Sequence, residues 1–339
     1  MEPAAVLRDL LAGRHLSAAQ AGDLMEALAS GDVPPAVGGG LLIALRAKGE
    51  TPEEVRGFAQ AMRRLAIHPP IPVQGPPLVD TCGTGGDGSG SLNLSTAAAL
   101  VCAAAGVRVV KHGNRSISSR AGSADVLEEL GVSVGVGPEA AAACLARTGF
   151  CFLFAPRYHP SMKAIMPVRR ALAVRTVFNV LGPLSNPVAP PFQVVGAFDL
   201  AVAEMMANAL AGMGVERAFV VHGAQGWDEA TPLGPFHLFD VRGGTVTHQQ
   251  RDPLSVGIPR CAASDLAGGD AAFNAKALAD LLAGSQGPHR DAATLAAGLA
   301  LEVTGVASDW ACGIAMANAA IEDGRSASLL DALRAEAGA

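Results

Sequence analysis

The sequence lacks any long uninterrupted apolar run. The longest such stretch, Ala97 to Val107, is much shorter than the roughly 18 to 20 residues that a membrane-spanning helix needs. The first residues, MEPAAVLRDLLAGR, do not show the basic and then apolar pattern of a signal peptide. We therefore expect a cytoplasmic protein with no membrane partner.

Paired cysteines and basic runs are absent as well. The six cysteines are scattered without a C-x-x-C motif and lie mostly in apolar stretches, which favours buried free thiols over disulfides or a zinc site. The net charge is −6 and no run of lysine and arginine stands out. This balance argues against nucleic acid as a nonspecific partner, so any site for an anion must be local.

The pattern of the chain changes near residue 70. The first 66 residues predict helices only, with capping boxes at Ser17 and Thr51. A proline-rich segment, IHPPIPVQGPP, then ends the helical pattern. Beyond it, short apolar runs alternate with helix-length segments. We predict an α/β protein with a small all-helical domain at 1–70 and a large α/β domain at 71–339, built on a mainly parallel central sheet.

The segment DTCGTGGDGSGSLNLSTAAALV, residues 80–101, follows the first expected strand and is rich in glycine and serine. Gly83, Gly85 and Gly88 match the dinucleotide motif G-x-G-x-x-G, but the next strand ends in Lys111 where an acidic residue is required. A Walker A loop is excluded because Ser89 stands where its lysine belongs. A different phosphate ligand remains open.

Polar loops follow each expected strand, at 83–95, 111–123, 156–170 and 222–230. In a parallel sheet these loops meet at one edge. Glycine-rich backbone and a helix beginning near Ser95 would bind an anion, with mobile positive charge from Lys111, Arg115 and Arg120. Neutral hydrogen bonds could come from Asn93, Ser95, Thr96, Asn114, Ser118, Ser119 and Ser123.

The adjacent acidic residues Asp228 and Glu229 would repel phosphates unless a cation lay between them. Their hard oxygen atoms suit Mg²⁺, so a metal-bridged pyrophosphate is the simplest interpretation. Each feature alone also has a structural explanation. The glycine-rich segment can be a turn, the acidic pair a solvated turn, and Ser95 a helix cap.

Six segments in order along nearly the whole chain carry a resemblance to a known family. They are GDVPPAVGGGLLIALRAKGETPEEVRGFAQAMR, DTCGTGGDGSGSLNLSTAAA, KHGNRSISSRAGSADVLEELG, FLFAPRYHPSMKAIMPVRRALAVRTVFNVLGPLSNP, VVHGAQGWDEA and LAGGDAAFNAKALADLLAG. The chain resembles the anthranilate phosphoribosyltransferases, pentosyltransferases of the nucleoside phosphorylase-like class that act in tryptophan biosynthesis. One departure is Ala173, which stands where the family usually has glycine.

The resemblance implies a site for each substrate and for the metal. Phosphoribosyl pyrophosphate would be bound by Gly83, Gly86, Asp87, Ser91, Asn93, Leu94, Ser95, Thr96, Lys111, His112, Gly113, Asn114, Arg115, Ser116, Ile117, Ser118, Ser119 and Ser123. Anthranilate would meet Gly83, Asn114 and Arg169, and two Mg²⁺ ions per subunit would be held by Ser95, Asp228 and Glu229. Lys111 and Arg169 are the expected catalytic residues. The resemblance also implies a homodimer joined through the helical domain, to which about 168–190 contributes.

Two other functions stay open. A pyrimidine nucleoside phosphorylase shares the expected fold, although KHGNR and PVRR fit the transferase better. A noncatalytic relative that binds nucleic acid would have lost the acidic pair and gained a basic surface, and neither feature is visible in the sequence.

Overall fold

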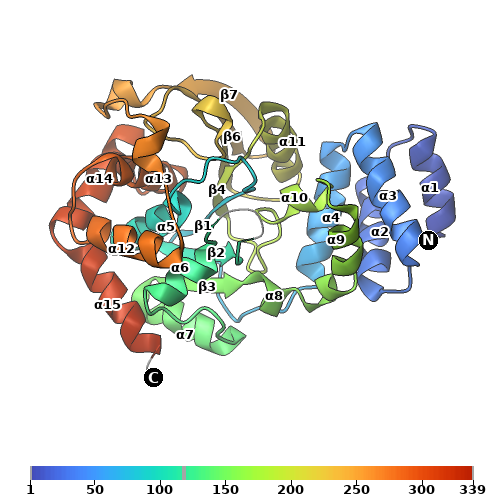
Figure 1. The fold of residues 1–339 in the computed structure, drawn as a ribbon, viewed down its shortest axis with the longest axis horizontal. Helices are drawn as coiled ribbons and strands as arrows, with labels where there is room; N and C mark the ends of the chain where they lie inside the picture. Colours follow the sequence, from blue (N-terminus) through green and yellow to red (C-terminus); the bar gives the residue numbers. More distant parts are fainter. Residues whose placement is uncertain (1, 117–119, 338–339) are drawn as a thin grey trace.

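A bundle of helices forms one end of the protein, in a computed structural model that describes residues 2–116 and 120–337 (Figure 1). The bundle comprises α1 (Pro3–Leu11), α2 (Ala18–Ser30), α3 (Pro35–Lys48), α4 (Pro52–Arg64) and, from the middle of the chain, α9 (Met166–Leu172). Gly39 of α3 lies against the side chains of Val168 and Leu172, and α9 packs directly on α3. The division of the chain near residue 70 stays a prediction.

A buried carboxylate ties three of the bundle helices together. Both predicted capping boxes are present, at Ser17 with Gln20 and at Thr51 with Glu54. Glu54 is fully buried, and its carboxylate accepts hydrogen bonds from the backbone N–H of Leu16 (2.8 Å) and from Lys48 Nζ (2.9 Å). One side chain therefore joins the segment before α2, the end of α3 and the start of α4.

The other end of the protein is a mainly parallel sheet, as predicted. Its strand order is β3-β2-β1-β4-β5-β6-β7, and only β6 and β7 are antiparallel to their neighbours. The strands are β1 (Leu78–Gly83), β2 (Arg108–Gly113), β3 (Phe150–Phe154), β4 (Phe192–Gly196), β5 (Arg217–His222), β6 (Phe236–Arg242) and β7 (Thr245–Arg251). The sequence analysis did not predict the β6–β7 hairpin, whose second strand is mostly exposed.

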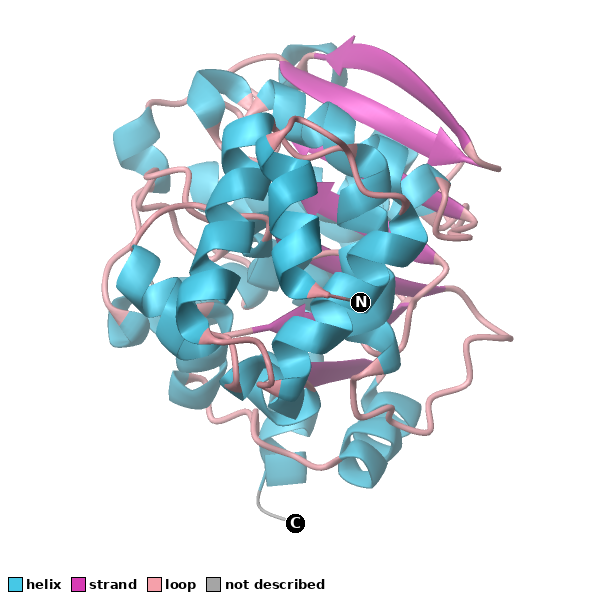
Figure 2. Cartoon of the chain, turned by 90° about the vertical axis from the view of Figure 1, so that its right-hand side faces the viewer, coloured by secondary structure: helices cyan, strands magenta, loops and turns pink. Residues whose placement is uncertain are grey.

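Helices cover both faces of the sheet (Figure 2). On one face α5 (Leu94–Ala104) and α13 (Pro288–Val303) bury apolar side chains such as Val109 and Phe219, and on the other α11 (Leu200–Ala211) packs between the sheet and α4. The remaining helices are α6 (Ser123–Glu129), α7 (Pro138–Thr148), α8 (Ala155–Tyr158), α10 (Phe178–Leu181), α12 (Ala271–Leu282), α14 (Trp310–Glu322) and α15 (Arg325–Ala337).

The cysteines and the lengths of the apolar helices bear on two expectations from the sequence. All six cysteines are free thiols, as predicted, but only Cys102 and Cys151 are buried and the other four are partly exposed. Within the described residues, no helix is both long enough and apolar enough to span a membrane.

The alanine that departs from the family pattern adopts a conformation that suits glycine. Ala173 follows the last residue of α9 with φ 51°, in the left-handed region. That region costs a non-glycine residue about 1 kcal/mol or more. The structure thus explains why glycine is the usual residue at this position.

Replacing Glu54 with alanine should destabilise the protein by about 3 to 5 kcal/mol, because the buried Lys48 ammonium would lose its acidic partner and the backbone N–H groups of Leu16 and Thr51 would lose their acceptor. Urea unfolding measures the change. Glu53→Ala is the matched control, since Glu53 is exposed on the same turn, and should cost less than about 0.5 kcal/mol. An equal cost for both variants would contradict the assignment.

The same carboxylate predicts a dependence of stability on pH. Burial opposes its ionisation, but hydrogen bonds from Leu16, Lys48 and Thr51 outweigh burial and lower the pKa of Glu54. A lowered pKa stabilises the folded state above the unfolded value, about 4.3, and that contribution is lost as pH falls through the folded value. The stability difference between wild type and Glu54→Gln should therefore shrink below about pH 4.

Candidate functional site

Glycines at the carboxyl ends of three neighbouring strands make room for the acidic turn that follows β5. A Cβ atom added to Gly83, at the end of β1, would lie 2.3 Å from Asp228 Oδ2. One added to Gly196, at the end of β4, would lie 1.6 Å from the Asp228 carbonyl oxygen, and one on Gly223 would lie 2.0 Å from that of Glu229. A side chain at Gly196 or Gly223 would meet the backbone of the acidic turn, and one at Gly83 would displace the Asp228 carboxylate, so the acidic turn lies directly on the strand ends.

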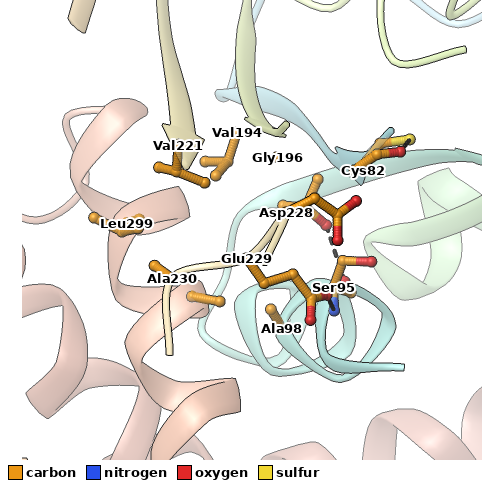
Figure 3. Close-up of a pocket in the computed structure, with 13 residues that line it drawn as sticks. Cys82, Ser95, Ala98, Val194, Gly196, Val221, Asp228, Glu229, Ala230 and Leu299 are labelled. Atoms are coloured by element: carbon orange, nitrogen blue, oxygen red, sulfur yellow. Dashed lines mark hydrogen bonds between the residues drawn. The ribbon is translucent and has the colours of Figure 1, made fainter. Parts of the chain in front are cut away.

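The two carboxylates reach into the anion-binding backbone that the sequence predicted. Asp228 Oδ2 accepts a hydrogen bond from Gly85 N (2.6 Å). Glu229 Oε1 accepts one from Ser95 N (2.9 Å), in the first turn of α5, and Figure 3 shows Glu229 beside Ser95. The sequence predicted that Asp228 and Glu229 bind only a cation. In the structure their carboxylates also accept hydrogen bonds from the backbone of the glycine loop and of α5.

The acidic pair is crowded as well as buried. Burial and the nearby Asp87 carboxylate raise the pKa of Asp228, and burial together with Asp228 and Asp87 raises the pKa of Glu229. A small cavity of about 30 Å³ lies beside these carboxylates, and apolar side chains such as Val194, Val221 and Leu299 line the rest of its wall.

The donor set fits a divalent cation that arrives with its own oxygen ligands. Among the described residues, no three histidine, cysteine or acidic side chains are gathered as a complete metal site. Mg²⁺ commonly takes one or two protein carboxylates and completes its shell with water and substrate phosphates. Asp228, Glu229 and the Ser95 hydroxyl could supply that protein share, and a cation would relieve the repulsion that raises both pKa values.

Lys111 is buried, and the expectation of a mobile charge was wrong for this residue. Only 2% of Lys111 is exposed, and its ammonium donates to the Thr81 carbonyl (2.6 Å) and to Ser95 Oγ (3.3 Å). Burial lowers its pKa, while the carboxylates of Asp80 and Glu229 act in the opposite direction. Lys111 is therefore a fixed positive charge between the end of β1 and the start of α5.

Arg115 was also expected to be a mobile charge, and this expectation was wrong because its guanidinium is paired with acidic residues of α6. It pairs with Asp125 (2.8 Å) and Glu128 (2.7 Å) on α6. The neighbouring backbone is ordered by α6 as well, since Ser123 Oγ donates to the Asn114 carbonyl (3.2 Å). Ile117, Ser118 and Ser119 lie outside the described residues, and their predicted contacts stay predictions.

His112 has its side chain on the opposite face of the sheet from Lys111. Its Nδ1 lies 3.2 Å from the Gly182 carbonyl oxygen and its ring packs on His159, where burial lowers the pKa of His112 to about 3. Only its backbone could meet a ligand at the strand ends.

The start of α5 is fixed by residues from far along the chain. Asn93 Nδ2 donates to the Ala121 carbonyl (3.1 Å), and Asn274 on α12 donates to Asn93 Oδ1 (2.9 Å). The side chains of Leu94 and Thr96 are buried, so only their backbone could contact a phosphate. Sequence reasoning missed Asn274, although it lies in the motif LAGGDAAFN.

The glycine loop itself carries two further predicted residues. Asp87 accepts hydrogen bonds from Ser89 N (3.1 Å) and from Asp228 N (3.3 Å), and Ser91 Oγ lies 3.3 Å from Ser89 Oγ. Burial, and to a smaller extent the charge of Asp80, raises the pKa of the nearby Cys82 thiol to about 12. The nucleophilic thiolate form of Cys82 is therefore disfavoured.

Arg169 is a half-buried cation without an acidic partner. Its guanidinium carbon lies 5.0 Å from the centre of the Phe178 ring, and its Nη1 lies 3.8 Å from Met166 Sδ. Burial lowers its pKa. Within the described chain no carboxylate forms a salt bridge with it and no hydrogen bond joins it to Gly83 or Asn114, the other residues predicted to meet the same ligand.

Arg175 is a further residue that sequence reasoning missed. Its guanidinium donates to the Gly86 carbonyl oxygen and lies 4.0 Å from the centre of the Phe198 ring. It thus contacts the glycine loop at Gly86, one residue after the amide that donates to Asp228. Only its place in the segment ALAVRT connects it with the site residues in sequence.

Comparisons with known proteins agree with this geometry. Residues 4–66 match the helical bundle domain of a glycosyl transferase family, and residues 75–327 match its a/b domain. The anthranilate phosphoribosyltransferase of Moorella thermoacetica is 45% identical over 97% of this chain and 96% of its own length.

Two solved structures extend the match to three dimensions. The crystal structure of the Thermus thermophilus enzyme of that name has a TM-score of 0.92 at 42% identity, covering 98% of this chain and 99% of the other. The enzyme of Saccharomyces cerevisiae in complex with PRPP and Mg has a TM-score of 0.89 at 26% identity, covering 99% and 98%. The chain belongs to the anthranilate phosphoribosyltransferase family.

Proposed function

We propose that this protein transfers the phosphoribosyl group of phosphoribosyl pyrophosphate to the amine of anthranilate and releases pyrophosphate, a step of tryptophan biosynthesis. The observation that carries the proposal is the acidic turn seated on the glycines at the strand ends, within reach of the amides of Gly85 and Ser95. In the same proposal the enzyme is a cytoplasmic homodimer with two Mg²⁺ ions in each subunit.

The negative charge that grows on the leaving pyrophosphate sets the first demand on the site. The amides of the glycine loop, the first turn of α5 and the fixed ammonium of Lys111 are preorganised to meet it, and preorganised donors are worth most where water is excluded. Mg²⁺, held by Asp228, Glu229 and Ser95, would supply further neutralisation of the phosphate oxygens when bound.

The second demand is the position of the attacking amine. Arg169, a half-buried guanidinium with no acid to pair with, suits the carboxylate of anthranilate, and its planar fork would fix the ring in one orientation. An aromatic amine is neutral and needs no prior deprotonation, so the proposal includes no strong general base. Orientation of two substrates in one closed site supplies much of the remaining acceleration.

A fluorescence assay of anthranilate consumption tests the proposal directly. With phosphoribosyl pyrophosphate and Mg²⁺ present, we expect anthranilate fluorescence to disappear and pyrophosphate to accumulate in equal amount. Phosphate-dependent cleavage of thymidine without anthranilate consumption would instead identify a pyrimidine nucleoside phosphorylase. Nucleic-acid binding with neither activity would indicate the noncatalytic relative.

The acidic pair provides a test of the metal assignment. Asp228→Asn combined with Glu229→Gln should lower kcat by at least about 100-fold, since a bound metal contributes several kcal/mol to the transition state. Without Mg²⁺ the melting temperature at pH 8 should not fall, because amide oxygens still accept from Gly85 and Ser95 while the repulsion from Asp87 is removed.

Glu204→Gln is the matched control, since it neutralises an exposed carboxylate on α11, and it should behave as wild type in both measurements. Turnover near the wild-type rate with an unchanged Mg²⁺ dependence in the double variant would refute the metal assignment.

Truncating Arg169 should impair one substrate selectively. Loss of one partner of a desolvated charge pair costs about 2 to 5 kcal/mol, so Arg169→Ala should lower kcat/KM for anthranilate by about 30-fold to several thousand-fold. Calorimetric titration should show little change in phosphoribosyl pyrophosphate binding. Arg169→Lys should recover only part of the loss, because an ammonium cannot reproduce the bidentate geometry.

The neighbouring Arg170 is exposed on the same helix, and Arg170→Ala serves as the control for charge. A fall of less than about 5-fold in kcat/KM for anthranilate with Arg169→Ala, well below the cost of breaking such a pair, would move the carboxylate site to another residue.

A further inference from the structure

One exposed arginine links three parts of the protein that meet at the site. Arg175 lies in the connector of residues 173–177, between α9 of the helical bundle and α10. Its guanidinium donates to the Gly86 carbonyl oxygen and stacks on Phe198, which follows β4. The bundle, the glycine loop and the end of the sheet are therefore joined through one side chain.

Phe198 is itself anchored to the same loop. Its backbone N–H donates to Thr84 Oγ1 (3.2 Å), and Thr84 N donates to the Gly196 carbonyl (2.9 Å). Thr84 is thus fixed to the end of β4, and Gly86, two residues further on, is fixed by the arginine that stacks on Phe198. The two contacts together fix residues 84–86 of the glycine loop.

The loop needs such support because its backbone is rich in unusual conformations. Gly85, Gly86, Gly88 and Gly90 all have positive φ, and glycine loses more conformational freedom on ordering than any other residue. The peptide groups must nevertheless present their N–H groups inward, as Gly85 N does toward Asp228. The contact of the Arg175 guanidinium with the Gly86 carbonyl oxygen restrains the peptide group that follows Gly86.

Arg175 has no acidic partner, since no carboxylate in the described parts of the chain forms a salt bridge with it. Besides the hydrogen bond to Gly86, its remaining contact is the stack on Phe198. A role in holding surface charges together is therefore not supported, whereas a role in holding the loop accounts for both contacts.

We propose that Arg175 is a positioning residue for the phosphoribosyl donor, holding the glycine loop of residues 83–91 in its binding conformation and coupling the loop to the connector from the helical bundle. The proposal rests on the function proposed above. Arg175 acts through the backbone of Gly86, so its loss should weaken binding of the donor and leave the acceptor site built around Arg169 intact.

The test compares Arg175→Ala, Arg175→Lys and Val174→Ala by calorimetric titration with phosphoribosyl pyrophosphate and Mg²⁺. Val174 is exposed in the same connector and is the matched control. Loss of one charge-assisted hydrogen bond should raise the Kd of Arg175→Ala about tenfold. Arg175→Lys should show a smaller rise, since an ammonium can still donate to the Gly86 carbonyl but cannot stack in the same way. Val174→Ala should match wild type.

Kinetics and hydrogen exchange separate this role from a general structural one. For Arg175→Ala, kcat/KM for anthranilate at saturating donor should stay within about threefold of wild type, and the melting temperature should be unchanged. In the free protein, amides of residues 84–88 should exchange faster in Arg175→Ala than in Val174→Ala.

Three outcomes would overturn the inference or its basis. Unchanged donor affinity and unchanged exchange in Arg175→Ala would show that the contact does not position the loop. Equal losses for both substrates with a lower melting temperature would show a structural role only. Failure of the wild-type protein to bind the donor would overturn the proposed function, while the exchange measurement on free protein would still decide whether Arg175 orders the loop.

Discussion

The rest of the site depends on the close packing of the 228–229 turn against the ends of β1, β4 and β5. That packing is possible only because Gly83, Gly196 and Gly223 carry no side chain. It brings two carboxylates against the amides of Gly85 and Ser95, which are the donors assigned to phosphate binding in the proposed function. The same geometry raises the pKa values of Asp228 and Glu229. The two carboxylates suit a cation and the neighbouring amides suit an anion.

The surrounding elements act on this arrangement from two sides. From within the sheet, Lys111 supplies a buried positive charge beside Ser95 and the acidic pair. From outside, the connector after α9 brings Arg175 onto the Gly86 carbonyl. The helical bundle contributes Arg169 through α9. In the proposed function, substrate positioning depends on the contact between the bundle and the sheet, which α4 and α11 bury with apolar side chains.

Features that depend on residues close in sequence could be predicted. The capping boxes at Ser17 and Thr51 depend on residues three positions apart, and the parallel strands were visible as short apolar runs between helices. The order of the polar loops also predicted that the glycine loop and the acidic turn meet, because parallel strands end on one side of a sheet. The β6–β7 hairpin escaped prediction because β7 exposes most of its side chains and shows no apolar pattern.

Features that depend on distant partners could not be predicted from one sequence. Lys111 looks like a loop cation until Thr81 and Ser95 enclose it, and Arg115 looks free until Asp125 and Glu128 on α6 bind it. The same holds for the carboxylate-to-amide hydrogen bonds of Asp228 and Glu229, which span more than a hundred residues of chain. Burial and long-range contact, more than residue type, determine what these groups do.

The most direct test of the proposed donor and Mg²⁺ site is calorimetric titration of the wild-type protein and of Gly83→Ala with phosphoribosyl pyrophosphate, with and without Mg²⁺. The added methyl group would occupy the space of the Asp228 carboxylate. We expect tight binding by wild type only when Mg²⁺ is present, and loss of that binding in a folded Gly83→Ala variant. Equal affinity with and without Mg²⁺, or wild-type affinity in Gly83→Ala, would contradict the proposed site.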